Sequence, residues 1–169
     1  MTLPVTPRRL TDGHPHGYAL RPEVPTPTDY LHLRRDSGLT PRTLEQAVLA
    51  LPGSWTACHV LDVASGLPVG MGRLISDGGW YFHVVDMAVL PAHQRKGIGT
   101  WVLAWLLDQI RAAAPPDASV SLMADPPGRR LYAQHGFTEK RDLSIGMAMW
   151  LGSDDDPAQR RGAANPSKR

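Results

Sequence analysis

The chain is poor in cysteine, because Cys58 is the only one among 169 residues. A single thiol excludes a disulfide framework within the chain. Cys58 lies in an apolar run from Trp55 to Val63, which favours a small buried core residue. No His–Asn or His–Asp spacing accompanies it, so an acyl-carrying cysteine nucleophile is the weaker hypothesis.

Long hydrophobic runs are also missing. No stretch approaches the roughly 20 apolar residues that a membrane-spanning helix needs, and Met1–Leu10 has no apolar signal region. We therefore expect a cytoplasmic protein that does not bind membranes. The net charge of +2 is too small to require a nucleic-acid partner. Edge strands leave a homodimer as one possible assembly.

The length and the hydrophobic fraction of 42% suit one domain with a real core. Residues 1–16 show no periodic apolar pattern and are expected to form a flexible N-terminal arm. Residues 152–169 have almost no large apolar side chains and are expected to be a disordered C-terminal tail. The folded domain is therefore expected to span residues 17–151.

Strand and helix signals alternate along this domain, which predicts an α/β fold with antiparallel hairpins early and a βαβ unit late. The predicted strands are Tyr18–Pro22, Trp55–Asp62, Val69–Ser76, Trp80–Leu90, Val120–Ala124 and two late strands, near Phe137 and over Ile145–Leu151. Predicted helices begin at Thr26-Pro27, at Thr40-Pro41 and at the Gly97-Ile98-Gly99 turn, and a short one covers Pro126–His135.

The helix after Gly97 has the clearest periodicity. Its apolar side chains recur at helical spacing, so we expect this stripe to pack into the core. The members of the stripe are Ile98, Trp101, Val102, Trp105, Leu106 and Ile110.

The most informative segment links a strand to this helix. An apolar strand ends at Leu90, and a polar turn closes on Gly97 and Gly99. Main-chain N–H groups at the positive end of the helix dipole make an anion site that suits two bonded phosphates. Glycine permits close approach of the backbone and a positive φ, and Arg95 and Lys96 add positive charge.

Two common phosphate-binding motifs do not fit this turn. A P-loop requires Gly-Lys-Ser/Thr after a fixed spacing, which the chain lacks. The dinucleotide-binding fingerprint requires a third glycine where Val102 stands. An ordinary strand–turn–helix, with the glycines serving tight packing, remains the plain alternative.

The segment Gln94–Gly99 resembles the Gln/Arg-x-x-Gly-x-Gly/Ala signature of the GNAT superfamily of N-acetyltransferases. Val85–Pro91 is similar to that family's fourth strand, and Leu131–Phe137 to its Leu-Tyr-x-x-x-Gly-Phe segment. Fainter similarity, over Leu122–Asp125 and Gly146-Met147, is to a branch with plant arylalkylamine-type enzymes and their bacterial relatives.

This resemblance implies the GNAT fold, a mixed central sheet of six to seven strands with flanking helices. In that fold the fourth and fifth strands splay apart to admit acetyl-CoA. The implied activity is transfer of acetyl from acetyl-CoA to a primary amine, on a small molecule or a lysine side chain, by direct attack on the thioester. No metal is implied. A non-catalytic acyl-CoA-binding regulatory module is the alternative.

The resemblance also implies which residues contact the cofactor. The pantetheine arm is expected along Met87, Ala88 and Val89. Asp125 stands where many members carry an asparagine, and a carboxylate could only accept a hydrogen bond there. The pyrophosphate is expected on one continuous turn, made of Gln94, Arg95, Lys96, Gly97, Ile98, Gly99 and Thr100.

Tyr132 is the candidate acid, because the resemblance places it near the cofactor sulfur. A phenol and a thiolate have comparable basicity, so proton transfer between them is nearly balanced. His83 and Asp86 are the candidate bases, and a water chain could serve instead. Strand alternation puts these two on opposite faces unless a bulge intervenes, so only one is expected to face the cleft.

Three arginines could read an acidic group on the acceptor. They are Arg34, Arg35 and Arg73. A solvated surface is the more common state of such residues.

Overall fold

The computed structural model describes residues 14–139. Within this range one sheet has the strand order β1-β2-β3-β4-β5, antiparallel except for the parallel pair β4–β5. The strands are β1 (Tyr18–Arg21), β2 (Thr56–Asp62), β3 (Pro68–Ser76), β4 (Tyr81–Val89) and β5 (Ser119–Leu122).

The described residues also form four helices and three short 3-10 turns. The helices are α1 (Pro27–Asp36), α2 (Leu44–Ala50), α3 (Ile98–Ala113) and α4 (Arg129–Gln134). The turns are η1 (Leu51–Gly53), η2 (Pro91–His93) and η3 (Pro126–Gly128). Of these, η3 and α4 follow β5, and the others lie between strands. This is the mixed α/β order that the sequence predicts.

The sequence predicts six to seven strands, whereas five lie in the described range. The predicted strand over Ile145–Leu151 lies outside the described residues. So do residues 1–13 of the predicted arm and the whole of the predicted tail, 152–169. The described chain around Phe137 forms no strand.

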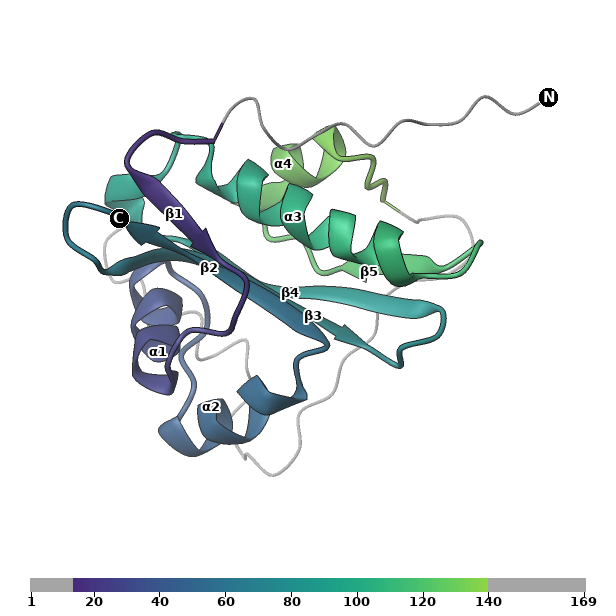
Figure 1. The fold of residues 1–169 in the computed structure, drawn as a ribbon, viewed down its shortest axis with the longest axis horizontal. Helices are drawn as coiled ribbons and strands as arrows, with labels where there is room; N and C mark the ends of the chain where they lie inside the picture. The colour runs from purple at the N-terminus through teal and green to yellow at the C-terminus, as the bar shows by residue number, and fades with distance from the viewer. Residues whose placement is uncertain (1–13, 140–169) are drawn as a thin grey trace, which may run out of the picture. The chain divides into compact units, whose positions relative to one another are not determined.

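Helices cover both faces of the sheet, with α3 on one face and α1 and α2 on the other (Figure 1). Two glycines on β3 let α3 approach closely. A Cβ on Gly70 would stand 2.9 Å from Ile98 Cγ2, and one on Gly72 would stand 2.7 Å from Val102 Cγ1. Because such distances are too short for carbon atoms, any side chain there would push α3 off the sheet.

The buried face of α3 differs slightly from the predicted stripe. Trp101 and Trp105 are only partly buried at its margin, whereas Leu103 and Leu107 are buried within it. A broad apolar stripe leaves large indole rings room at the edge, where they still pack against the core.

The first two helices begin with side-chain caps. Thr26 caps α1 by accepting from the Asp29 N–H at 3.1 Å, with Pro27 at the first helical position, as predicted. The predicted start of α2 at Thr40-Pro41 is wrong. The helix begins at Leu44, because Thr43 and Gln46 form a reciprocal capping box.

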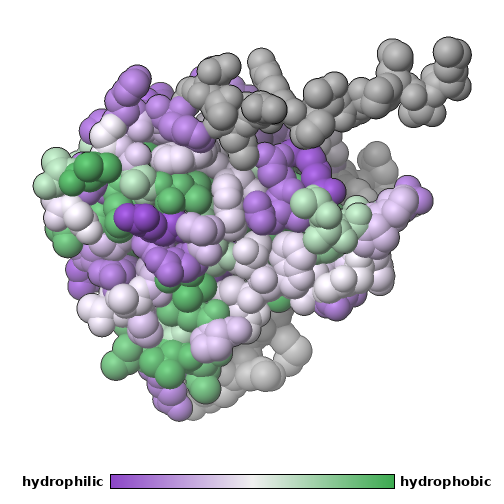
Figure 2. Space-filling model, in the orientation of Figure 1, coloured by the Kyte–Doolittle hydropathy of each residue, from purple (hydrophilic) through white to green (hydrophobic). Residues whose placement is uncertain are grey.

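α2 buries only Ala47. Three larger apolar side chains point to solvent, and Figure 2 shows hydrophobic surface over this helix. They are Leu44, Val48 and Leu49. Among the described residues, no helix has both the length and the apolar character needed to cross a membrane.

Candidate active site

Strands β4 and β5 stop pairing about halfway along β4. They pair only over Tyr81–Val84 and Ser119–Leu122. β5 then ends, whereas β4 continues to Val89 and stays paired with β3 on its other side. In the described part of the chain, the edge of β4 over residues 85–89 therefore has no β5 partner. Apart from the Val89 carbonyl, which accepts from Gln94 Nε2, the main-chain groups on this edge are available to a ligand.

A β-bulge lies at the start of this edge. Asp86 has a left-handed φ of 55°, and the β3–β4 register shifts by one residue beside it. Arg73 pairs with Val85 and Ile75 pairs with His83, so His83 shares the face of Arg73. Arg73 also binds Asp86. The bulge thus overrides strand alternation and places His83 and Asp86 on the same face, that of α1 and α2.

The turn after β4 gathers free N–H groups at the start of α3. The first helical bond runs from the Trp101 N–H to the Gly97 carbonyl at 3.0 Å. The N–H groups of Ile98, Gly99 and Thr100 therefore precede the helical hydrogen bonds. Arg95 and Gly97 both have left-handed φ values. Such conformations turn successive N–H groups toward a common anion, and a pyrophosphate fits this arrangement.

Gly97 and Gly99 differ in whether the backbone of the turn requires a residue without a side chain. Gly97 has φ 85° and caps α3, a conformation that other residues adopt only with strain. Its Cβ would meet just Pro15 Cγ, at 3.7 Å. A Cβ on Gly99 would stand 3.4 Å from Leu131 Cδ2, which is close to ordinary contact. Neither packing nor the backbone conformation therefore requires glycine at position 99, and alanine fits there.

Hydrogen bonds from polar side chains hold the turn to β4 and to β1. Gln94 Nε2 donates to the Val89 carbonyl at 3.0 Å, which ties the turn to the end of β4. Lys96 Nζ donates to the Tyr18 hydroxyl at 3.2 Å, and that hydroxyl also bonds His93 Nδ1 at 2.9 Å. Tyr18 carries no sequence signal for this role, because it lies on β1, far away in the chain.

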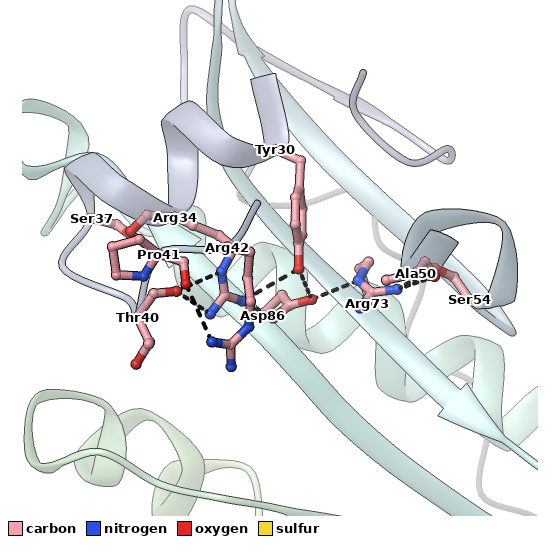
Figure 3. Close-up of polar contacts among 10 residues, drawn as sticks. All are labelled: Tyr30, Arg34, Ser37, Thr40, Pro41, Arg42, Ala50, Ser54, Arg73 and Asp86. Carbon is pink, nitrogen blue, oxygen red and sulfur yellow. Dashed lines mark hydrogen bonds and ion pairs between the residues drawn. The ribbon is translucent and has the colours of Figure 1, made fainter. Parts of the chain in front are cut away.

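Three donors converge on the Asp86 carboxylate (Figure 3). Arg73 Nε donates to Oδ2 at 2.7 Å, and the Tyr30 hydroxyl donates to the same oxygen at 3.0 Å. Arg34 Nη1 donates to Oδ1. Burial and the neighbouring carboxylate raise the pKa of Tyr30, so its hydroxyl keeps its proton.

Arg34 and Arg73 are therefore engaged inside the protein. Their side chains are 7% and 6% exposed, which removes them from the surface where an acceptor's acidic group would dock. Arg35 is the exception. Its side chain is 67% exposed and paired with Asp36 at 2.5 Å.

His83 is partly buried beside β5. Its Nδ1 bonds Ser121 Oγ at 2.9 Å. Burial lowers the pKa of His83 below its usual 6.5, because desolvation disfavours the imidazolium. The ring is therefore neutral at pH 7 and can accept a proton.

Tyr132 lies on the α3 side of the sheet. Its ring covers Gly128, where a Cβ would stand 2.7 Å from Cε2. It also meets Phe137 edge-on, with centroids 6.2 Å apart. Burial, and then the charge of Asp125, raise the pKa of Tyr132 above 10. The phenol is therefore protonated at neutral pH and can donate its proton. Asp125 itself is exposed at the start of η3.

Sequence reasoning missed Tyr30, Tyr18 and Ser121. A tyrosine in an amphipathic helix, such as Tyr30, is normally interpreted as a core residue. A serine in a short strand, such as Ser121, gives no indication of a functional role. Their roles depend on contacts between distant segments. Among residues 14–139, no three His, Cys, Asp or Glu side chains come together in a way that could hold a metal ion.

A known domain family and several solved structures match this chain in sequence and fold. The family model described as the acetyltransferase (GNAT) domain covers residues 54–139. A probable acetyltransferase of Staphylococcus aureus is 33% identical, with a TM-score of 0.75, and the match covers 79% of this chain and 98% of that one. A GNAT family protein of Streptococcus pneumoniae is 27% identical, with a TM-score of 0.64, over 80% of this chain and 98% of that one.

A third relative is the uncharacterized N-acetyltransferase ycf52 of Pyropia yezoensis, 29% identical over 112 residues. That match spans 65% of this chain and 63% of the relative's length. The fold is thus that of an acetyltransferase. The chain belongs to the GNAT family, whose members take acetyl from acetyl-CoA.

Proposed function

We propose that this protein transfers acetyl from acetyl-CoA to a primary amine, carried by a small molecule or a lysine side chain, by direct attack on the thioester. One observation carries the proposal. The β4 edge over residues 85–89, which has no β5 partner among the described residues, is followed after η2 by the turn of free N–H groups that opens α3. An acyl-pantetheine arm that ends in a pyrophosphate has the matching order of groups.

Binding divides between these two parts of the site. Met87, Ala88 and Val89 offer main-chain groups to the pantetheine arm, and their own side chains need only be apolar. Residues 95–100 offer N–H groups to the pyrophosphate, and the exposed Arg95 adds charge. Gln94 holds the turn against β4.

The acceptor amine has to lose a proton, because its free pKa near 10.4 keeps it charged at pH 7. We assign His83 as the base. We assign the tautomer in which His83 Nδ1 donates to Ser121 Oγ, which leaves Nε2 unprotonated and able to take a proton. Asp86 is not assigned this role, because its carboxylate oxygens already accept bonds from Arg34, Arg73 and Tyr30.

The bond changes then balance as follows. The ammonium form first releases one proton to solvent. The neutral nitrogen then bonds the acetyl carbon while its second proton passes to His83 Nε2. The carbon–sulfur bond breaks, the departing thiolate takes the proton of Tyr132, and the proton on His83 afterwards returns to Tyr132 through solvent. The main-chain N–H groups of the β4 edge offset the charge that develops on the carbonyl oxygen.

The test is a turnover assay with the full chain. Purified protein is mixed with acetyl-CoA and a panel of arylalkylamines, polyamines and lysine peptides. Free thiol is followed, and products are identified by mass. We expect acetylation of at least one amine class. Binding of acetyl-CoA by calorimetry without acetylation of any amine would instead support the non-catalytic acyl-CoA-binding module.

A further inference from the structure

We propose that Arg34, Arg73 and Tyr30 form a clamp on Asp86, called here the Asp86 clamp, which fixes the β4 bulge in the shape that presents the β4 edge to the thioester. Asp86 is then a positioning residue and does not accept the substrate proton. The catalytic consequence rests on the proposed acetyl transfer, whereas the structural part does not.

The bulge needs outside support. Asp86 has φ 55°, a region that a residue with a Cβ occupies at a cost in strain, although aspartate and asparagine enter it more often than others. β5 cannot supply that support, because its pairing with β4 ends at Val84. Beyond that point β3 is the one strand among residues 14–139 that pairs with β4, and the register with β3 is itself interrupted at the bulge.

The clamp adds support from a further element, α1, through Tyr30 and Arg34. It also adds a side-chain bond from β3, through Arg73. Both guanidinium groups and the phenol ring are buried. Ala88, two residues after Asp86, is 4% exposed and packs in the same apolar cluster as Tyr30.

Each arginine is itself anchored on main-chain or hydroxyl oxygens. Arg34 donates to the Thr40 carbonyl from Nε at 3.0 Å and from Nη2 at 2.7 Å. Arg73 Nη1 donates to the Ala50 carbonyl at 3.1 Å and to Ser54 Oγ at 2.7 Å. These bonds tie the loop before α2 and the end of α2 to the bulge (Figure 3).

All three donors point their hydrogens at one carboxylate. Oδ1 accepts from Arg34, and Oδ2 accepts from Arg73 and Tyr30. A carboxylate that served as the base would need a lone pair aimed at the substrate. Here the side chain reaches back toward α1, and the open feature is the main chain of β4.

The test compares two neighbouring arginines of α1. Arg34→Gln breaks the clamp, whereas Arg35→Gln removes an exposed arginine with the same change of charge. Asp86→Asn removes the carboxylate but keeps a residue that tolerates a left-handed φ. Hydrogen exchange of the β4 peptide and steady-state kinetics are measured for each variant.

We expect faster exchange over residues 85–89 in Arg34→Gln and Asp86→Asn, and wild-type exchange in Arg35→Gln. In the two clamp variants kcat/KM should fall by about 10- to 100-fold. When kcat/KM is plotted against pH, the midpoint of the acid limb should be the same in these variants as in the wild-type protein. The double variant Arg34→Gln/Asp86→Asn should lose no more kcat/KM than the more impaired single variant, because both substitutions break the same clamp.

The proposal is overturned if Asp86→Asn keeps wild-type exchange yet loses the acid limb, which would make Asp86 the base. It is also overturned if Arg34→Gln matches Arg35→Gln in exchange. Should the clamp variants fail to fold, Tyr30→Phe removes only the bond that Tyr30 donates to Asp86 and the bond that it accepts from Arg34, and unchanged exchange over residues 85–89 would contradict the clamp. If the wild-type protein acetylates no amine, the proposed function fails, and the exchange data still decide the clamp.

Discussion

Tyr132 shows how far surroundings determine the chemistry of one side chain. Its phenol is enclosed by Gly128 and Phe137, and burial raises its pKa. Tyr132→Phe keeps the ring and removes the acid. We expect kcat to fall by roughly 100-fold or more, with the affinity for CoA unchanged in calorimetry. Unchanged turnover would remove Tyr132 from the mechanism.

His83 should set the acid limb of activity. Burial lowers its pKa, so kcat/KM should rise with pH and reach half its plateau below pH 6.5, as the imidazolium loses its proton. His83→Gln keeps a donor for Ser121 and should lose both this limb and most of the rate. A variant whose pH–rate profile still bends at the same pH would show that another group is the base.

Cys58 should be inert. It is fully buried, and desolvation raises its pKa to about 12, so almost no thiolate exists at pH 8. We expect iodoacetamide to modify the native protein far more slowly than the unfolded chain, and Cys58→Ala to retain activity. Rapid labelling of the native protein with parallel loss of turnover would contradict direct transfer from the thioester.

At the scale of elements, the two glycines of the turn between β4 and α3 should respond differently to substitution by alanine. Gly97→Ala imposes a left-handed φ on a residue with a Cβ, which should cost about 1–2 kcal/mol and weaken CoA binding. Gly99→Ala adds an ordinary contact and should change both properties little. Thermal unfolding and calorimetry with CoA make the comparison, and equal effects at the two positions would contradict this account.

Sequence patterns predict most elements because their signals are local. Thr26 and Pro27 define the start of α1. The start of α2 was misplaced because Thr40-Pro41 mimics a helix start, while the competing box of Thr43 and Gln46 prevails. The marginal positions of Trp101 and Trp105 depend on how α3 lies on the sheet, which periodicity alone does not determine.

The bulge and its clamp could not be predicted in the same way. A positive φ at Asp86 has no periodic signature, since aspartate also occupies ordinary strands. Its partners Tyr30 and Arg34 lie 56 and 52 residues away in the chain. Only the folded arrangement of α1 against β4 shows that these groups meet. Two of the three arginines that could have read an acceptor, Arg34 and Arg73, are enclosed for the same reason.

At the scale of the whole molecule, ligand binding should stabilise the fold. Any ligand that binds only the native state raises its stability, by about 2.7 kcal/mol at 100 times the Kd. We therefore expect a clear rise in Tm with acetyl-CoA, and a smaller rise with free pantetheine, which lacks the pyrophosphate. Equal shifts with both ligands would mean that the turn before α3 does not bind phosphate.

The order of elements was predictable from the sequence, because each strand and helix is bounded by turn and cap signals. The parting of β4 from β5 was implied by the family resemblance, since no local signal marks where a parallel ladder ends. The described structure adds the reason, which is that β5 stops at Leu122 while β4 runs on to Val89.

The central claim is that one continuous stretch of main chain, from the bulge on β4 to the first turn of α3, binds acetyl-CoA. The most direct measurement is hydrogen exchange of the full-length protein with and without saturating acetyl-CoA. We predict protection of the β4 peptide from Met87 onward and of residues 95–100, with little change in α2. Binding that leaves both segments unprotected, or no binding at millimolar acetyl-CoA, would contradict the claim.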